Sequence, residues 1–278
     1  MNNGLCKVEF RNVRLSFGDR VVLDGVNFQV GTGELKMILG ASGSGKSTIL
    51  RLILGLIKPD DGEIFIGEEE ISRLRETELM PIRRRISMVF QDGALFDSLT
   101  VYDNVAYRPR ELGWDEDKIE GRVLRVLDEV NLLDEADAYP DELSGGMRRR
   151  VAFARAVVDM PEIILFDEAT AGLDPPTARE ICQLMIRLRD LEGVSVIFVT
   201  HKLNDVLYLS SNYMLTEKGD KAELLAEGKS LNLINTKILL LRDGRIAFEG
   251  TDEQLWNSDD PYIRNFIRMD DQGLNNQL

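Results

Sequence analysis

The sequence predicts an α/β protein with a parallel β-sheet at its core, an antiparallel β part near its beginning and an inserted helical part. Two continuous apolar runs, at 163–166 and 194–199, flank a helical stretch at 177–190. This is the pattern of parallel strands that are buried on both faces. A further apolar run at 37–39 leads into a glycine-rich loop and then into a helical pattern. Residues 92–159 have mainly helical periodicity, which predicts the insertion.

The antiparallel part comes first along the chain. Apolar and polar residues alternate over 8–30, which predicts twisted antiparallel strands with one buried face. A Pro-Asp-Asp-Gly turn at 59–62 leads into a strand at 63–66, and 86–90 is another buried strand. We expect the strands over 8–30 to cover the ligand of the glycine-rich loop.

The glycine-rich loop at 40–48 is predicted to bind phosphate. Its glycines allow backbone N–H groups to curl around phosphate oxygens, and the N-terminus of the following helix adds a favourable dipole. Lys46 can reach the β and γ oxygens of a nucleotide, and the Ser47 hydroxyl can bind Mg²⁺. A nucleoside triphosphate is therefore the expected ligand. The loop residues expected to hold it are Gly40, Ser42, Gly43, Ser44, Gly45, Lys46, Ser47 and Thr48.

Two further motifs carry phosphate chemistry. Asp167 and Glu168 end an apolar strand; we predict that Asp167 reaches Mg²⁺ through water and that Glu168 polarises the attacking water. A hydrolytic ATPase needs such a pair. Ser144, Gly145 and Gly146 open another helix and make a second anion site. Two phosphate-binding loops with one pair of carboxylates indicate that the second loop completes a site on another molecule.

The last third of the chain adds a hairpin and a helical tail. Strands at 237–241 and 245–249 flank an Arg-Asp-Gly turn, which predicts the hairpin. The polar segment 217–235 is predicted to be an insertion that forms a hairpin or a helix, either as a surface excursion or as a partner contact. The tail has an apolar helical face that we expect to pack on the chain's own core rather than across a dimer.

Composition narrows the function classes. The chain has 278 residues, of which 44% are hydrophobic, enough for a substantial core. Its net charge of −14 disfavours an electrostatic grip on nucleic acid, although the arginine triplets at 83–85 and 148–150 could form local basic patches. Cys6 and Cys182 lack metal-ligand spacing and are expected to be reduced thiols. We expect a cytoplasmic protein, because neither a signal peptide nor an apolar run of about 20 residues is evident.

Together these motifs resemble the nucleotide-binding subunit of ATP-binding cassette (ABC) transporters. The resemblance rests on Lys46, on Asp167 with Glu168 and on the loop at 143–147, and it covers residues 7–250. It implies a single nucleotide-binding domain over 1–278 with the ABC ATPase fold. The family's parts would fall as follows: a RecA-like P-loop NTPase core with an antiparallel β subdomain at 1–91 and 160–250, a helical subdomain at 92–159, and a C-terminal helical tail at 251–278.

The resemblance also implies roles for individual residues. In this family two subunits close head to tail, so ATP would lie between the P-loop of one subunit and Ser144, Gly145 and Gly146 of the other. Phe17 matches the aromatic residue that stacks on adenine, and Asp174 belongs to the loop that contacts the other subunit. The positions that match the family's catalytic residues are Glu168, His201, Gln91 and Lys46. The positions that match its Mg²⁺ ligands are Ser47, Gln91 and Asp167.

Two stretches resemble a narrower group, the Mla-type ATPases of lipid transport. One is the run at 90–101, and the other is the loop at 143–147, where Met147 stands in place of the glutamine of most family members. The resemblance implies a homodimer of ATPase subunits, held at the inner membrane by an integral-membrane permease, with an MCE-type lipid-binding protein as a further partner. Five apolar residues would either receive the permease or pack the helical subdomain: Ala94, Leu95, Phe96, Leu99 and Val101.

Other functions remain open at this point. The nearest alternative is the ATPase subunit of a small-solute importer, and a division-type signalling ATPase is another. Cassette ATPases that act on DNA or ribosomes carry long coiled coils or two fused cassettes, and this chain has neither. Ala169 stands where the family usually has proline after the catalytic glutamate, and we expect activity to survive because no reactive group is lost.

Overall fold

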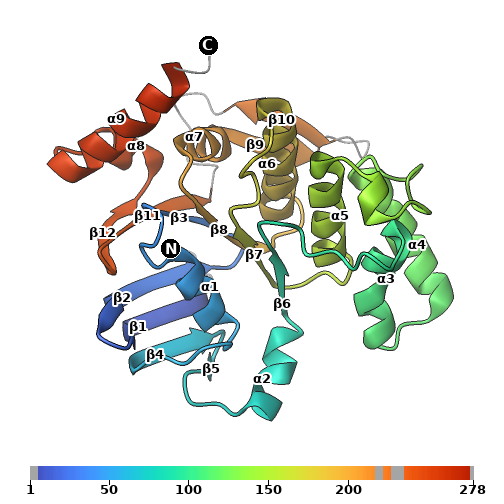
Figure 1. The fold of residues 1–278 in the computed structure, drawn as a ribbon, viewed down its shortest axis with the longest axis horizontal. Coiled ribbons are helices and arrows are strands. Elements are labelled where there is room, and N and C mark those ends of the chain that lie inside the picture. Colours follow the sequence, from blue (N-terminus) through green and yellow to red (C-terminus); the bar gives the residue numbers. More distant parts are fainter. Residues whose placement is uncertain (1–5, 217–221, 227–234, 276–278) are drawn as a thin grey trace.

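A mostly parallel β-sheet lies at the centre of the molecule (Figure 1). The computed structural model describes residues 6–216, 222–226 and 235–275. Within them, the largest sheet has the strand order β12-β11-β3-β8-β7-β6. These strands are β3 (Leu35–Leu39), β6 (Ile86–Val89), β7 (Ile163–Asp167), β8 (Ser195–Thr200), β11 (Thr236–Arg242) and β12 (Arg245–Gly250). Neighbours are parallel except for the β11–β12 hairpin, so the predicted parallel core is confirmed.

The central strands are apolar throughout because both faces of this sheet are covered. Met37 and Leu39 of β3 belong to one hydrophobic core, whereas Ile38 belongs to the other. Strands β7 and β8 alternate between the two cores in the same way. Since side chains of a strand point to opposite faces in turn, a doubly covered strand reads as a continuous apolar run.

An antiparallel sheet and a short helix cover one face. This sheet has the strand order β2-β1-β4-β5, and its strands are β1 (Cys6–Phe17), β2 (Arg20–Gly31), β4 (Asp61–Ile66) and β5 (Glu69–Glu70). Helix α1 (Lys46–Ile53) packs between the two sheets, with Ile49 and Leu50 fully buried in their shared core. Helix α2 (Glu76–Arg83) contributes Leu79 and Ile82 to the same core.

Helices cover the opposite face and extend beyond the sheet (Figure 1). Helices α5 (Gly145–Val157), α6 (Pro175–Asp190) and α7 (Leu203–Ser211) contribute to the second core. Beside them lie α3 (Val101–Glu111) and α4 (Glu116–Glu129) (Figure 1). The 3₁₀ turn η1 (Pro140–Glu142) precedes α5 in the chain. Side-chain caps fix where these helices begin: Thr100 accepts a hydrogen bond from the Asp103 N–H at 3.1 Å, and Asp115 accepts one from the Asp117 N–H at 3.1 Å.

The C-terminal tail packs on the chain's own core, as expected. It forms α8 (Asp252–Trp256) and α9 (Pro261–Asn275), and Leu255 and Ile263 are buried in the same core as α5 and α6. The predicted insertion at 217–235 lies largely outside the described residues. Its described strand, β10 (Ala222–Ala226), pairs antiparallel with β9 (Asn212–Thr216), which precedes the insertion. The rest of the expected hairpin or helix lies outside the described residues.

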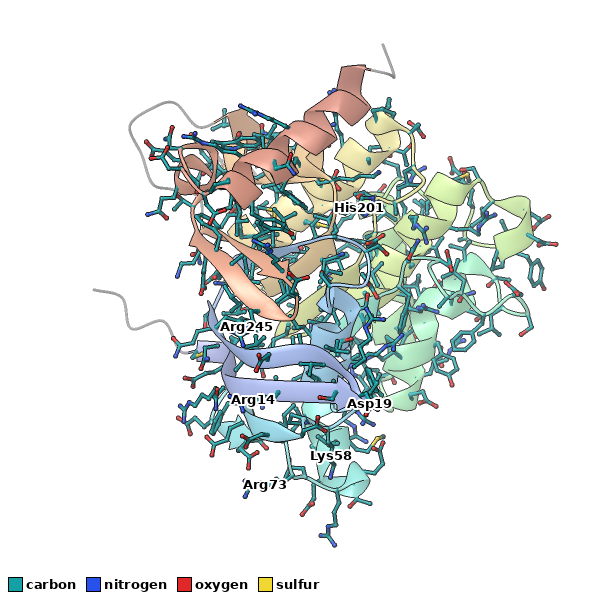
Figure 2. All side chains as sticks on the ribbon, turned by 60° about the vertical axis from the view of Figure 1, so that its left-hand side comes forward. Arg14, Asp19, Lys58, Arg73, His201 and Arg245 are labelled. Atoms are coloured by element: carbon teal, nitrogen blue, oxygen red, sulfur yellow. The ribbon has the colours of Figure 1, made fainter. Side chains whose placement is uncertain are left out.

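Most arginines of the two triplets bind groups of this chain. Arg85 forms ion pairs with Glu162 and Glu69, each at 2.8 Å, and Arg83 pairs with Glu76. In the second triplet, Arg148 and Arg150 donate hydrogen bonds to backbone carbonyls. Other cations, including Arg14, Lys58 and Arg73, lie on the antiparallel part, on the opposite side of the view from His201 (Figure 2). Among the described residues, none of the helices combines the length and apolar character needed to cross a membrane.

Candidate nucleotide site

The glycine-rich loop joins the end of β3 to the start of α1 and requires glycine for steric reasons. A Cβ atom on Gly40 would lie 2.6 Å from the Leu241 carbonyl oxygen, closer than such atoms approach. Gly45 has a φ of 106°, a conformation that side chains strongly disfavour, and it lies directly before Lys46, the first residue of α1. The loop therefore wraps tightly around the N-terminus of α1, where backbone N–H groups have no intrahelical partner and attract anions.

A cavity of about 500 Å³ opens in front of this loop. The predicted residues that line it are Phe17, Ser42, Gly43, Gly45, Lys46, Ser47, Thr48, Gln91 and Glu168. Arg20 and Val22, at the start of β2, also line it and were not predicted. Their position in the sequence could have indicated this, because they follow the turn after Phe17. The two strand ends that a hairpin turn joins lie side by side.

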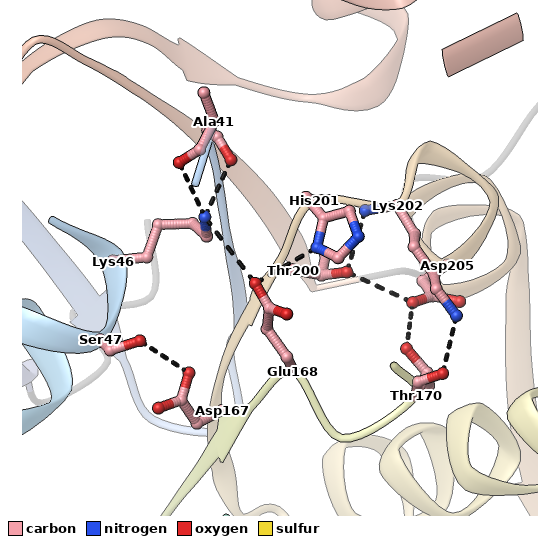
Figure 3. A network of polar contacts seen from close by, with 11 residues as sticks. Ala41, Lys46, Ser47, Asp167, Glu168, Thr170, Thr200, His201, Lys202 and Asp205 are labelled. Carbon is pink, nitrogen blue, oxygen red and sulfur yellow. Dashed lines mark hydrogen bonds and ion pairs between the residues drawn. The ribbon is translucent and has the colours of Figure 1, made fainter. Parts of the chain in front are cut away.

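Lys46 lies at the floor of the site, 5% exposed. Its Nζ donates hydrogen bonds to the carbonyls of Gly40 and Ala41, at 2.9 and 3.1 Å, and lies 3.9 Å from Glu168 Oε1 (Figure 3). Burial lowers the pKa of Lys46, while the carboxylates of Glu168 and Asp167 act in the opposite direction. The buried Ser44 hydroxyl has no hydrogen-bond partner within the described chain. A confined cation and an unpaired hydroxyl fit the oxygens of a polyphosphate.

Two of the three side chains expected to hold Mg²⁺, Ser47 and Asp167, are in direct contact. Ser47 Oγ donates a hydrogen bond to Asp167 Oδ1 at 2.9 Å (Figure 3), and Gln91 lines the same cavity. Burial raises the pKa of Asp167, and the hydrogen bond from Ser47 opposes that shift. A hydroxyl, a carboxylate and an amide oxygen are ligands that suit Mg²⁺, which also keeps waters and phosphate oxygens in its shell. These residues fit the predicted metal.

Glu168 and His201 follow neighbouring strands and meet at the edge of the site. His201 Nδ1 lies 3.2 Å from Glu168 Oε1, and the His201 side chain is 50% exposed. Glu168 has a φ of +48°, which is uncommon for a residue with a side chain. Its N–H donates to the Val199 carbonyl at 3.0 Å. The carboxyl ends of parallel strands β7 and β8 thus bring together two residues that are 33 positions apart.

The predicted second anion loop lies away from this cavity. Ser144 caps α5 by accepting a hydrogen bond from the Met147 N–H at 3.2 Å. Asp174 caps α6, accepting from the Thr177 N–H at 3.1 Å and from its hydroxyl at 2.7 Å, and these bonds lower the pKa of Asp174. A Cβ atom on Gly146 would lie 2.7 Å from Thr177 Cγ2. The first turns of α5 and α6 therefore abut each other, and neither Gly146 nor Asp174 lines the cavity of its own chain.

In the apolar stretch after Gln91, some side chains are buried and others are exposed. Val101 is fully buried in the core of the helices, so its role is internal. Phe96 is 42% exposed, with its ring centroid 4.7 Å from that of Tyr107. Asn104, which is fully buried, fixes this segment: it accepts from the Phe96 N–H at 2.8 Å and donates to the Phe96 and Leu99 carbonyls at 3.1 Å.

Comparison with known proteins shows the family of this chain. The family model described as "ABC transporter" matches residues 23–171. The chain belongs to the ABC transporter family. It is 41% identical over 224 residues to a methionine import ATP-binding protein, MetN, of Rhodopseudomonas palustris, covering 80% of this chain but only 59% of that protein. It is 37% identical over 274 residues to the intermembrane phospholipid transport system ATP-binding protein MlaF of Haemophilus influenzae, covering 98% of this chain and 94% of MlaF.

A solved structure supports the fold assignment. The cassette MJ0796, described as a dimer in a post-hydrolysis state bound to ADP and Pi, matches with a TM-score of 0.71 and 33% identity, over 88% of this chain and 98% of that chain. The predicted ABC ATPase fold, the ATPase class and the use of ATP with Mg²⁺ are therefore confirmed. The Mla-type assignment is not decided by these comparisons, because MetN and MlaF are similar to this chain at nearly the same identity.

Proposed function

We propose that this chain is the ATP-hydrolysing subunit of a lipid transporter. The supporting observation is the extent of the similarity to MlaF, which takes in 98% of this chain and 94% of MlaF. The match to the MetN protein takes in 80% of this chain. Met147 and the run at 90–101, which resemble the Mla-type group, support the same choice.

In the proposed reaction the cavity residues act on the phosphates of ATP. Lys46 and the N-terminus of α1 hold the β and γ oxygens, and Ser47, Gln91 and Asp167 hold Mg²⁺. Bound Mg²⁺ neutralises charge that develops on the phosphates. Glu168 orients a water for in-line attack. His201, whose ring lies 3.2 Å from Glu168, steadies the γ-phosphate.

A second copy supplies the missing part of the site in this proposal. Ser144, Gly145 and Gly146 lie outside the cavity of their own chain, so in a head-to-tail homodimer they reach the ATP of the partner. ATP then binds the closed dimer better than the open one, and hydrolysis removes that difference. We further propose that the dimer acts on the cytoplasmic face of the inner membrane, bound to a permease that works with an MCE-type lipid-binding protein.

Methionine import, or import of another small solute, is the second candidate. The 41% identity to MetN favours it. It uses the same ATPase residues, so no substitution in the cavity distinguishes it from lipid transport. The two differ in what accompanies the permease: a lipid-binding protein with phospholipid, or a soluble solute-binding protein.

Purification of the native complex tests this choice. The tagged chain is extracted from native membranes in mild detergent, and the proteins and lipids that accompany it are identified by mass spectrometry. The same tag on an unrelated cytoplasmic protein is the control. We expect a permease, an MCE-type protein and enriched phospholipid. A permease with a soluble solute-binding protein and no enriched lipid would contradict the lipid assignment and support solute import.

Replacing Phe17 by alanine is expected to weaken ATP binding without slowing hydrolysis at saturation. Phe17 is 53% exposed and lines the cavity, so its ring is accessible to a base bound there. Stacking of an aromatic ring on a base contributes about 1–3 kcal/mol, so the Kd for ATP should rise roughly tenfold. Titration with ATP measures it, with Val21→Ala as the matched control, because Val21 is 59% exposed in the same hairpin and does not line the cavity. An unchanged Kd in Phe17→Ala would remove Phe17 from the site.

A further inference from the structure

A buried carboxylate lies behind the catalytic edge of the sheet. Asp205 is in the first turn of α7 and is 5% exposed. It does not line the nucleotide cavity, and the family resemblance gave it no role. A buried carboxylate needs hydrogen-bond donors to offset its lost hydration, and the identity of those donors indicates its function.

Asp205 binds the two segments that carry Glu168 and His201. Its Oδ2 accepts a hydrogen bond from the hydroxyl of Thr170, two residues after Glu168. The same oxygen accepts one from the hydroxyl of Thr200 at 3.3 Å, directly before His201. Thr170 and Thr200 are themselves fully or almost fully buried. Figure 3 shows Asp205 between these two hydroxyls, on the side of Glu168 and His201 away from Lys46.

Lys202 closes this network. Its Nζ donates to the Thr170 carbonyl at 2.7 Å, and its N–H donates to the Thr200 hydroxyl at 3.1 Å. The turn after β7 and the end of β8 are thus joined by side chains as well as by the sheet. Burial raises the pKa of Asp205, and the hydrogen bonds from the two threonines oppose that shift.

The backbone of Glu168 needs such support. Its φ of +48° is a conformation that costs of the order of 1 kcal/mol or more for a residue with a side chain, and it persists when neighbouring contacts fix it. The N–H of Glu168 is held by Val199 on β8. The following turn is held at Thr170, where the hydroxyl bonds to Asp205 and the carbonyl to Lys202.

We propose that Asp205 is a positioning residue for ATP hydrolysis. It holds Thr170 and Thr200 at one oxygen and so fixes Glu168 relative to His201. This inference rests on the proposed roles of Glu168 and His201. An acidic residue in the first turn also stabilises a helix through its dipole, so a purely structural role for Asp205 is the alternative that the experiment must separate.

The test compares variants that remove the network at either end. Thr170→Val keeps the shape of the side chain and removes its hydroxyl, and Asp205→Ala removes the acceptor. A misplacement of about 1 Å can slow an enzyme about 100-fold, so we expect kcat to fall about 10- to 100-fold in each variant. The Kd for ATP should change less than about threefold, because the P-loop contacts are untouched. The double variant should be no slower than Asp205→Ala alone, since Thr170→Val removes only a hydrogen bond that Asp205→Ala already removes.

Two further variants keep the result interpretable. Asp205→Asn retains an oxygen that can accept both hydroxyls, and it is expected to recover most of the rate lost in Asp205→Ala. Ser210→Ala removes a buried hydrogen bond of the same helix, from Ser210 to the Val206 carbonyl at 2.7 Å, and should leave kcat unchanged. Thermal unfolding of every variant is measured in parallel.

Several outcomes would overturn the proposal. They are a normal kcat in Thr170→Val or Asp205→Ala, additive losses in the double variant, or no recovery in Asp205→Asn. A loss of kcat in Ser210→Ala that matches its loss of melting temperature would also overturn it, because the effect of the Asp205 variants would then be one of stability alone. Glu168→Gln, assayed alongside, tests whether Glu168 acts in hydrolysis at all. It therefore distinguishes a wrong role for Asp205 from a wrong assignment of the catalytic site. If Glu168→Gln hydrolyses ATP normally, the role given to Glu168 is wrong whatever the Asp205 variants do.

Discussion

Glu168→Gln is expected to reduce ATP hydrolysis at least about 100-fold while ATP still binds. A glutamine side chain occupies the same space but cannot accept a proton from the attacking water, and a positioned base contributes about 100- to 10,000-fold. The closed dimer should then persist, because the γ-phosphate that favours closure is not removed. Phosphate release measures hydrolysis, and gel filtration with ATP and Mg²⁺ measures dimer formation.

Glu120→Gln is the control for this variant, because Glu120 is exposed on α4 and away from the cavity. It should hydrolyse ATP normally and return to monomer as ATP is consumed. A Glu168→Gln protein that stays monomeric with ATP would contradict the head-to-tail closure. One that hydrolyses ATP at the normal rate would show that another group orients the water.

Lys46→Met is expected to lose ATP binding as well as hydrolysis. A hydrogen bond to a charged group contributes about 1.5–3 kcal/mol, so the Kd for ATP should rise about 10- to 100-fold and hydrolysis should become undetectable. Folding should not suffer, because burial already disfavours the charge of Lys46, as its lowered pKa indicates. We expect the melting temperature without nucleotide to be unchanged or higher.

Isothermal titration with ATP and a thermal melt measure these two effects. Lys58→Met, on the exposed surface of the antiparallel part, is the control and should resemble the unaltered chain. If Lys46→Met binds ATP normally, the cavity is not a phosphate site. If its melting temperature falls well below that of Lys58→Met, the ammonium group stabilises the fold through its bonds to Gly40 and Ala41 rather than serving a ligand.

Sequence reasoning predicted features that depend on local chemistry. The loop from Gly40 to Ser47 could be identified because its glycines and its lysine have fixed spacing between a strand and a helix. Strands β7 and β8 could be identified because burial on both faces makes them apolar throughout. The order of these elements predicts a parallel sheet. In such a sheet the functional residues lie at the carboxyl ends of the strands.

Features that depend on distant contacts were missed or left undecided. Nothing near Asp205 in the sequence indicates that Thr170, 35 positions earlier, donates to its side chain. The N–H of Glu168, which has a positive φ, likewise bonds to Val199 on the neighbouring strand. Phe96 and Val101 look equivalent as apolar residues, yet one is exposed and the other buried because of the way α3 packs.

Lipid transfer by the reconstituted complex is the most direct test of the proposed lipid-transport function. The chain is incorporated, with the permease and lipid-binding protein that purify with it, into vesicles containing a labelled phospholipid, and transfer of the label is followed with and without ATP. We predict ATP-dependent transfer with the unaltered chain and none with Glu168→Gln. ATP hydrolysis that responds to methionine or another small solute, with no phospholipid transferred, would contradict the lipid assignment.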